Sequence, residues 1–355
     1  DFIDFASAVN KGESLADWQN ADGHVALLND IDMSGVTEWT PIGDVVFTWA
    51  SNKLTITEGT PFTGYFDGQG HKITGFKAVC ANSTAVRPWG LFGCIGEGGI
   101  VENLVFDSTC SLEAKPTAST DIGLIAGLLN QGTIRNVTSS ASINLENGAP
   151  DNLRVTIGLV GFAFAGDVEA LIEKVTNDGT IKADAGANTK NGATGVHVSG
   201  ILGFGTNDVS SSKEVIVKEC VNNAPIEAAA PRASGIVAAA NRFTNMTGCV
   251  NNGDNTNTFK TSGGSRLGNI TCITGAGSTM ADAINYGDLV STTAGCAGGI
   301  ICLVNADDNS FTRVKSYGKV ITDKTDSYIG TFFGQCNKAA VFSECVAGGD
   351  LGTYN

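Results

Sequence analysis

The chain has 355 residues and a formal net charge of −14, and this acidity already excludes some partners. Nucleic acids and anionic membranes bind basic patches, so neither is expected as a partner. No apolar run approaches the roughly 18 residues of a membrane-spanning helix, so the sequence predicts no transmembrane segment. The 46 glycines and 7% aromatic residues are typical of tight turns around a narrow core.

The N-terminal residues predict a short amphipathic helix. In DFIDFASAVNKG, Phe2, Phe5, Ala6 and Val9 recur at helical spacing, and Gly12 is positioned to end the helix. Such a helix would cover unpaired strand edges at the end of a β-structure, which otherwise promote aggregation. The first residues lack the charged and apolar regions of a signal peptide, so we expect any export signal to have been removed already.

The next segments predict short strands separated by turns. HVALLNDIDMSG (24–35) predicts a first strand, and FTGYFDGQGHKITGF (62–76) predicts two strands around a tight turn. The residues of that turn are assigned structural roles, and they include Asp67, Gly68 and Gly70.

From residue 86 onward, one short motif returns eight times. A small residue, two aliphatic residues and another small residue appear first as WGLFG (89–93) and last as IGTFFG (329–334). Neighbouring copies lie 30 to 42 residues apart, and their first glycines are Gly90, Gly123, Gly158, Gly200, Gly235, Gly268, Gly298 and Gly330. A recurring period of this length indicates a solenoid of stacked units.

The second half of each repeat also aligns, in segments such as CVNNAPI (220–226) and CVNNGDN (249–255). One column is apolar and is expected to point inward, and it includes Cys220, Cys249 and Cys345. Two positions later comes a polar column whose side chains can hydrogen-bond along the stack as structural residues, and it includes Asn177, Asn222, Asn251 and Asn285. Asn255 interrupts a further, apolar column, so a local bulge is expected there.

The strand pattern defines the expected fold. The segments are short, rich in β-branched residues and broken by glycine and asparagine, and nothing between them reads as a crossover helix. About 30 residues suffice for three short strands and three turns, which make one coil of a β-helix with coils about 4.8 Å apart. The sequence predicts an all-β fold, a single-stranded right-handed parallel β-helix (solenoid) domain over 1–355 with roughly nine to ten coils. Residues 1–85 would form the N-terminal cap and first coils, and 86–355 eight repeats of about 34 residues.

The ten cysteines are expected to be small buried residues rather than a disulfide framework. Cys94, Cys272 and Cys302 share a second column, four residues after the repeat glycine. Cys272 and Cys302 lie on adjacent coils and could be close enough to bridge, although stacked strands often lack the required geometry. No C-x-x-C or Cys/His spacing suggests zinc, so no metal and no cofactor are predicted.

The sequence contains no recognisable catalytic motif. H-E-x-x-H, G-x-S-x-G and the P-loop are missing, and the three histidines are scattered. Many parallel β-helices are nevertheless polysaccharide lyases or glycoside hydrolases, which need paired carboxylates or a calcium-binding cluster. Asp254 and Asp288 share a repeat position, but Lys319 follows on the next coil, so solvated acids are the simpler interpretation.

Two surface features favour binding. Tyr286 and Tyr317 occupy the same outward turn position on successive coils and could form a platform for a sugar ring, although an inert aromatic ladder explains them too. A second pair, which could form a basic spot for an acidic glycan or a salt-bridged edge, consists of Arg232 and Arg266. Recognition also commonly uses connections of variable length, which here lie at 43–61, 107–121, 182–199 and 205–214.

The chain resembles a known family over nearly its whole length, most specifically at residues 24–106. The run LLNDIDMSG, EWTPIG (38–43), FTGYFDGQGHKITGF, WGLFG and VENLVF (101–106) is similar to the opening segment of secreted bacterial adhesin-like proteins with GLUG-type repeats. The resemblance implies a right-handed parallel β-helix displayed at a cell surface, often as a lipoprotein of a Gram-negative gut bacterium. It carries no catalytic residues to transfer to this chain.

The sequence and the resemblance together favour one function. We expect a non-catalytic, exported binding protein of the adhesin type, a monomer with a possible lipid anchor upstream. Its expected partner is a glycan or a protein ligand on a host or bacterial surface. The alternative is a polysaccharide-active β-helix enzyme.

Overall fold

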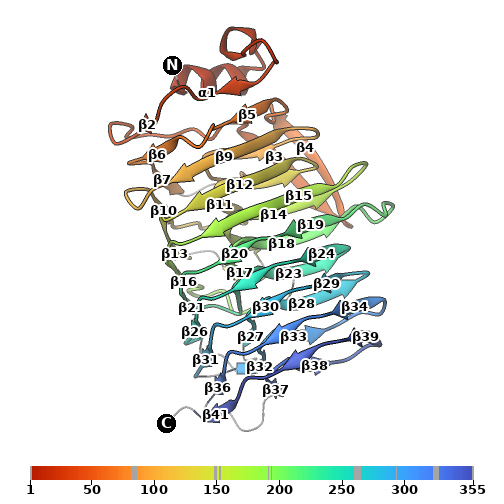
Figure 1. The fold of residues 1–355 in the computed structure, drawn as a ribbon. Coiled ribbons are helices and arrows are strands. Elements are labelled where there is room, and N and C mark those ends of the chain that lie inside the picture. Colours follow the sequence, from red (N-terminus) through yellow and green to blue (C-terminus); the bar gives the residue numbers. More distant parts are fainter. Residues whose placement is uncertain are drawn as a thin grey trace.

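The chain winds into a parallel β-solenoid (Figure 1). The computed structural model describes residues 2–80, 86–147, 150–151, 153–190, 192, 194–259, 265–292, 294–322 and 328–353. Among these residues three long sheets of 17, 13 and 9 strands run along the molecule and form about eight turns. The prediction of an all-β parallel β-helix with an N-terminal helix is confirmed, with slightly fewer coils than the nine to ten expected.

The 17-stranded sheet receives two strands from most turns. Its strands are β1 (Val25–Ala26), β2 (Ile31–Asp32), β5 (Tyr65–Asp67), β6 (Lys72–Thr74), β9 (Ile100–Phe106), β12 (Thr133–Ser139), β15 (Ala170–Asn177), β19 (Val215–Lys218), β20 (Val221–Asn222), β24 (Thr244–Thr247), β25 (Val250–Asn251), β29 (Thr279–Ala281), β30 (Ile284–Asn285), β34 (Asn309–Thr312), β35 (Lys315–Ser316), β39 (Ala340–Ser343) and β40 (Val346–Ala347).

The 9-stranded sheet follows it from the turn of β5 and β6 onward. Its strands are β7 (Lys77–Cys80), β10 (Ser111–Ala114), β13 (Ser142–Glu146), β16 (Ile181–Asp184), β21 (Ile226–Ala229), β26 (Asn255–Asn257), β31 (Leu289–Ser291), β36 (Val320–Thr322) and β41 (Leu351–Thr353).

The 13-stranded sheet completes the turn. Its strands are β8 (Phe92–Ile95), β11 (Thr120–Asn130), β14 (Val155–Ala165), β17 (Val196–Ser199), β18 (Leu202–Asn207), β22 (Arg232–Ser234), β23 (Val237–Arg242), β27 (Ser265–Gly268), β28 (Thr271–Ala276), β32 (Ala294–Gly298), β33 (Ile301–Val304), β37 (Tyr328–Gly330) and β38 (Phe333–Cys336).

The core is built from columns of inward side chains that repeat in register. Ile143, Ile181 and Ile226 pair across β13, β16 and β21, and each is almost fully buried. The pairing continues through Asn255 to Leu289 without a register shift, so the predicted bulge is wrong. The buried amide needs no bulge because its Nδ2 atom donates a 3.0 Å hydrogen bond to a main-chain carbonyl inside the turn.

The small-residue column of the repeat differs from the predicted one at two turns. Ser199 pairs with Ser234, and Val198, one residue earlier, pairs with Ile157. Those two serines therefore occupy the column that the sequence analysis gave to Gly200 and Gly235. Both serine side chains are fully buried, because serine is small enough for the bend between the two strands of the 13-stranded sheet.

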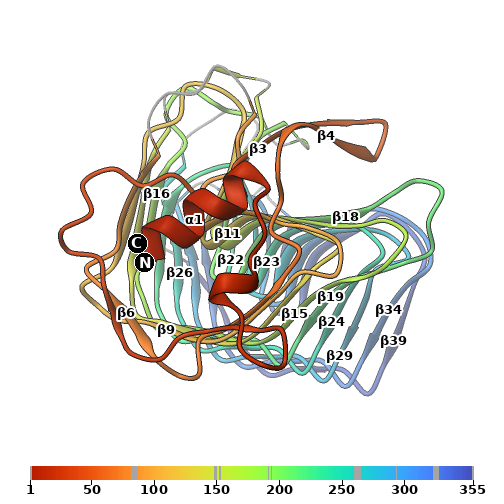
Figure 2. The same ribbon diagram turned by 90° about the horizontal axis from the view of Figure 1, so that it is seen from above.

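Helix α1 (Phe2–Lys11) lies across the N-terminal end of the solenoid, as Figure 2 shows from above. A short 3-10 helix (Ala16–Trp18) follows it. The Phe5 ring packs 6.1 Å from Phe62 and 5.9 Å from Phe66, measured between centroids. Gly12 has a φ of +68°, which suits the residue that ends a helix. The helix therefore covers the apolar end of the first turns.

Residues 43–61 are not the loop that the sequence analysis expected. They contain strands β3 (Val45–Ala50) and β4 (Lys53–Gly59), which pair as an antiparallel hairpin outside the solenoid. Ser51 and Asn52, at the hairpin tip, have φ values of 52° and 57°, as a tight two-residue turn requires. The hairpin buries Val45 and Phe47 against an apolar column on the outer face of the 13-stranded sheet. The alternation of apolar residues around Ser-Asn is the signal that could have predicted it.

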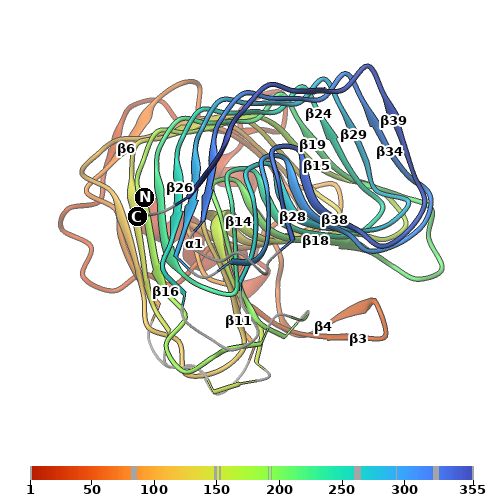
Figure 3. The ribbon, with the colours of Figure 1, turned by 90° about the horizontal axis from the view of Figure 1, so that it is seen from below.

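Figure 3 shows the last described turn from below. Phe342 pairs with Phe311 in the turn before it, yet Phe342 is 38% exposed whereas Phe311 is fully buried. Leu351, which extends the column of Val320, is 59% exposed. Side chains of the inward columns are thus more exposed in the last described turn than in the turns before it.

Candidate functional site

The turns between the 17-stranded and 9-stranded sheets are held by a buried asparagine ladder. Asn177 donates from Nδ2 to Oδ1 of Asn222 at 2.8 Å, Asn222 donates in the same way to Asn251 at 2.8 Å, and Asn251 donates to Asn285 at 2.9 Å. None of the four side chains is exposed. Three of them also donate to the carbonyl two residues later, at 2.9 to 3.0 Å. The ladder fixes the turn and directs the next residue outward.

The residue after each ladder position forms an exposed column. Asn223 donates from Nδ2 to Oδ1 of Asp178 at 2.8 Å, and Asn252 donates to Asn223 at 2.7 Å. Tyr286 and Tyr317 continue this column in the next two turns, because Asn251 pairs with Asn285 and Asn285 with Ser316 one residue earlier. The solenoid thus presents three polar side chains and two aromatic side chains in one axial row, which we call the turn row.

Tyr286 and Tyr317 form a stacked pair at the surface. Their ring centroids lie 5.4 Å apart, the ring planes differ by 19°, and the residues are 53% and 43% exposed. Their backbone amides donate to Asn251 O and Asn285 O, both at 2.8 Å, so the turns hold the rings in register. Because the rings face each other, a sugar could contact only one ring face at an end of the stack, and not both rings side by side. Each ring therefore has one face turned toward its partner, and the other face of Tyr317 is directed toward the turn that contains Gly348.

The two arginines of the expected basic spot lie deeper than predicted. Arg232, in β22, is only 4% exposed, and Arg266 pairs with it from β27. Burial, with the neighbouring charge of Arg266, lowers the pKa of Arg232 to about 10, and burial also lowers the pKa of Arg266. The Arg232 guanidinium lies 3.5 Å from Nδ1 of His197. Arg232 therefore belongs to the interior, which corrects its assignment to a surface spot for acidic glycans.

Asp67 holds the turn that its sequence suggested. Its Oδ1 accepts hydrogen bonds from the backbone N–H of Gln69 at 2.8 Å and from Asn103 Nδ2 at 2.9 Å. Gly70 has a φ of +78°, and a Cβ atom on Gly68 would come within 2.5 Å of Asn103 O. The flanking strands β5 and β6 both pair with β9 and not with each other, so the turn is a corner of one coil.

The inward cysteine column is buried in the middle of the solenoid and open at its end. Cys220 and Cys249 are fully buried, and the Cys249 thiol lies 3.3 Å from Val217 O. Burial raises the pKa of Cys220 well above its ordinary value. Cys345 is only partly buried because it belongs to the last described turn.

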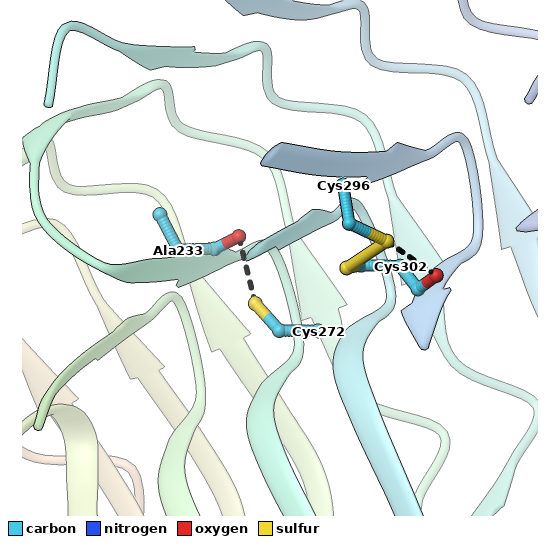
Figure 4. The surroundings of a disulfide bond; sticks show 4 residues. All are labelled: Ala233, Cys272, Cys296 and Cys302. Carbon is cyan, nitrogen blue, oxygen red and sulfur yellow. Dashed lines mark hydrogen bonds between the residues drawn. A yellow bond between two sulfur atoms is a disulfide. The ribbon is translucent and has the colours of Figure 1, made fainter. Parts of the chain in front are cut away.

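The structure contains a disulfide that the sequence analysis did not predict (Figure 4). Cys296 and Cys302 are joined across the bend between β32 and β33, with Cα atoms 5.6 Å apart. Cys272, the partner considered for Cys302, is a free thiol that donates to Ala233 O at 3.1 Å. Cys94 was predicted to share a column with Cys272 and Cys302. It belongs to a different column, in which it pairs with Leu128 of the next turn.

A groove of about 670 Å³ lies on the outer face of the 9-stranded sheet. Its polar lining consists of Asn144, Glu146, Lys182, Asp184, Glu227, Thr256 and Thr258. Lys115 Nζ lies 2.7 Å from Glu146, and Lys182 Nζ lies 3.1 Å from Glu227, so lysines neutralise two of the carboxylates. The lining that the structure describes presents amide, carboxylate, ammonium and hydroxyl groups, and it includes no histidine.

The stacked acids of the neighbouring turns hold backbone instead of facing a cleft. Asp254 accepts a 2.8 Å hydrogen bond from the backbone N–H of Asp288, and Asp288 accepts one of 2.7 Å from that of Lys319. These contacts explain the repeat of acids at this position as turn stabilisation.

Sequence reasoning missed a buried ion pair beneath the hairpin. Arg154 donates to Asp121 from Nε at 3.1 Å and from Nη2 at 2.7 Å, and Asp121 is fully buried. The guanidinium also lies 4.8 Å from the Trp49 ring and 4.4 Å from the Phe162 ring. No local sequence pattern predicts that this pair is buried, because the hairpin that covers it comes about a hundred positions earlier in the chain. Its buried contacts indicate a structural role.

Two negative findings concern the described ranges alone. Within them no group of three or more His, Cys, Asp or Glu side chains is placed to hold a metal ion. Over the same residues, no helix has the length and apolar character needed to cross a membrane.

The fold and the turn row define a parallel β-solenoid with an exposed aromatic stack. No protein-family profile matches the chain. It is 32% identical over 142 residues to Halomucin from Haloquadratum walsbyi, covering 38% of this chain and 1% of Halomucin. It is 33% identical over 121 residues to a protein of Evansella cellulosilytica provisionally named a Gly-rich membrane protein, covering 32% of this chain and 12% of that protein. The chain thus spans a small share of both relatives.

One solved structure has a similar course over most of the chain. It belongs to a Bacteroides ovatus protein provisionally named an immunoglobulin A1 protease, and the match covers 94% of this chain and 77% of that one. The TM-score is 0.39 and the sequence identity 15%, so this likeness carries no argument about function.

Proposed function

We propose that this protein is a non-catalytic, exported binding protein of the adhesin type, which recognises a glycan at a cell surface. The observation that carries the proposal is the exposed stack of Tyr286 and Tyr317 in the turn row. Exposed aromatic rings on a rigid scaffold can pack against the apolar C–H face of a sugar, and the turns hold both rings in place for such a contact.

The rest of the turn row suits the same ligand. Asp178, Asn223 and Asn252 are exposed and lie on the three turns before Tyr286. Amide and carboxylate groups can donate to and accept from sugar hydroxyls, so the row combines polar and stacking contacts in one line. With turns about 4.8 Å apart, the row is roughly 19 Å long, which suits an oligosaccharide better than a single sugar.

The cellular setting is part of the proposal. A disulfide persists in an oxidising compartment, and Cys296–Cys302 supports export. The name of the Evansella relative refers to a membrane protein, which is consistent with display at a surface. The proposal takes residues 1–355 as one β-helix domain, monomeric and held at the outer surface by a lipid anchor upstream.

A polysaccharide-active enzyme is the second candidate, and the groove on the 9-stranded sheet is the observation that favours it. Glu146 and Asp184 occupy the same outward column on adjacent turns. The Glu146 carboxylate is held in a surface ion pair with Lys115, at 2.7 Å, and this engages one of the two acids. Incubation with a panel of polysaccharides tests the candidate, because release of reducing or unsaturated ends would establish activity.

A glycan array followed by calorimetry tests the binding proposal. The double variant Tyr286→Ala/Tyr317→Ala should lose binding while the solenoid stays folded, because both side chains lie outside the core. Tyr328→Ala is the matched control, since Tyr328 is 57% exposed and lies outside the stack. Unchanged affinity in the double variant, or no retained glycan for the wild type, would overturn the proposal.

A further inference from the structure

We infer that the sugar stacks on the outer face of Tyr317, in the space left by Gly348, and that it is an uncharged hexopyranose unit. The inference rests on the proposed function and assigns its subsite and ligand class. Tyr286 covers the inner face of Tyr317, with the two ring centroids 5.4 Å apart. A sugar ring can therefore stack only on the opposite face of Tyr317.

Gly348 decides whether that opposite side is open. It occupies the turn-row position one turn beyond Tyr317, since Ser316 pairs with Ala347 just before it. Its backbone N–H donates to Ser316 O at 2.7 Å. A Cβ atom on Gly348 would lie 3.0 Å from Cδ1 and 3.3 Å from Cε1 of Tyr317. Any side chain at this position would therefore lie against the ring, and glycine leaves the ring face free.

The backbone at this position does not itself demand glycine. Gly348 is not among the residues with positive φ, whereas the next residue, Gly349, would place a Cβ atom 2.0 Å from Gly318 O. The neighbouring glycine is thus required by packing, and Gly348 is not. At this exposed position, Gly348 leaves beside the Tyr317 ring the space that a side chain would fill.

The charges around the subsite point to a neutral sugar. Lys319 and Asp350 are the exposed charged residues two positions after Tyr317 and Gly348, and their opposite signs cancel locally. The chain as a whole carries −14, which repels acidic glycans. Arg232, which would have attracted them, is buried. A hexopyranose that presents C–H groups on one face can stack on an aromatic ring, and this contact needs no charged group on the protein.

The subsite is tested by filling the space that Gly348 leaves. Gly348→Leu places an aliphatic side chain against Tyr317, and calorimetry with cellohexaose as the neutral probe should show roughly a tenfold loss of affinity, the scale of one aromatic contact. Gly352→Leu is the control, because its Cβ atom would meet only the Ile321 side chain, at 3.2 Å. Thermal unfolding of both variants verifies that the last turns stay intact.

The outcomes separate this inference from the proposed function. Wild-type binding that is lost in the tyrosine double variant but unchanged in a folded Gly348→Leu overturns the subsite and leaves glycan binding standing. Tighter binding of tri-galacturonic acid than of cellohexaose overturns the neutral class. Failure of the wild type to bind any glycan overturns both proposals.

Discussion

Asn222 and Asn251 lie 29 residues apart in the chain, yet the Nδ2 atom of the first donates a 2.8 Å hydrogen bond to the Oδ1 atom of the second inside the solenoid. The bond joins two consecutive turns through side chains that have no solvent exposure. The same contact repeats at Asn177 and Asn285, so four turns are connected by one line of amides.

Asn251→Ala should destabilise the protein by roughly 2–4 kcal/mol, because it leaves buried polar groups on Asn222 and Asn285 with fewer partners. Chemical unfolding measures the loss. Asn252→Ala removes a similar bond at the exposed neighbouring position and should cost no more than about 0.5 kcal/mol. Equal losses in the two variants would contradict a special role for the buried ladder.

Cys249→Asp should be severely destabilising, by more than about 4 kcal/mol, because a carboxylate without a partner would enter a dry column. Cys249→Ala should cost much less, since it removes only one sulfur atom from the packing. Cys336 is exposed, so Cys336→Asp is the control and should leave the melting temperature nearly unchanged. A well-folded Cys249→Asp protein would show that this column is wet or mobile.

Removal of residues 1–12 should make the protein oligomerise or aggregate, because the deletion uncovers Phe62 and Phe66 and the first strand edges. Light scattering after size exclusion provides the measurement. A single substitution, Phe5→Asp, should act in the same direction. Ile3→Asp changes a residue that is 56% exposed on the same helix and should have little effect. A monomeric truncated protein with unchanged thermal stability would rule out the capping role.

Glu173 should contribute a small pH-dependent stability through Lys218. The hydrogen bond from Lys218, 2.7 Å long, holds the pKa of the Glu173 carboxyl below its ordinary value. A carboxyl with a lowered folded-state pKa stabilises the fold above its unfolded pKa of about 4.3, and the contribution disappears as pH falls through the folded pKa.

Lys218→Met should therefore raise the pKa of Glu173 and remove that part of the acid dependence of stability. Carboxyl NMR titration measures the shift directly, and thermal melts between pH 3 and 6, a range about the ordinary glutamate pKa, measure its effect on stability. The change in stability should be small, because the pair lies at the surface and water screens the interaction. An unchanged Glu173 titration in the variant would show that another group sets its pKa.

Most of the architecture could be predicted because solenoid contacts are nearly local. Each turn packs on the turns before and after it. The sequence spacing of residues in one column, such as Ile143, Ile181 and Ile226, is therefore enough to predict the fold. The register of individual glycines was harder, since Ser199 and Ser234 satisfy the same bend one position earlier than the glycines do. Small residues are interchangeable wherever the only requirement is space.

The candidate site could be predicted only in part from the sequence. The sequence placed Tyr286 and Tyr317 in one column, but their stacking angle and the bare outer face beside Gly348 depend on how three turns pack. The burial of Arg232 could not be predicted from the sequence, because it depends on how strands of the 13-stranded sheet pack against their surroundings.

The sequence by itself determined the solenoid, its helical cap and the columns of inward, polar and exposed residues, because periodicity and turn chemistry act within one repeat. Tertiary structure alone decided the features that join distant segments. The hairpin of residues 45–59 lies over Phe162 and Phe204, Arg154 pairs with Asp121 beneath it, and Cys302 bonds to Cys296 rather than Cys272. Such contacts depend on the bend and outer shape of the 13-stranded sheet, which no single repeat encodes.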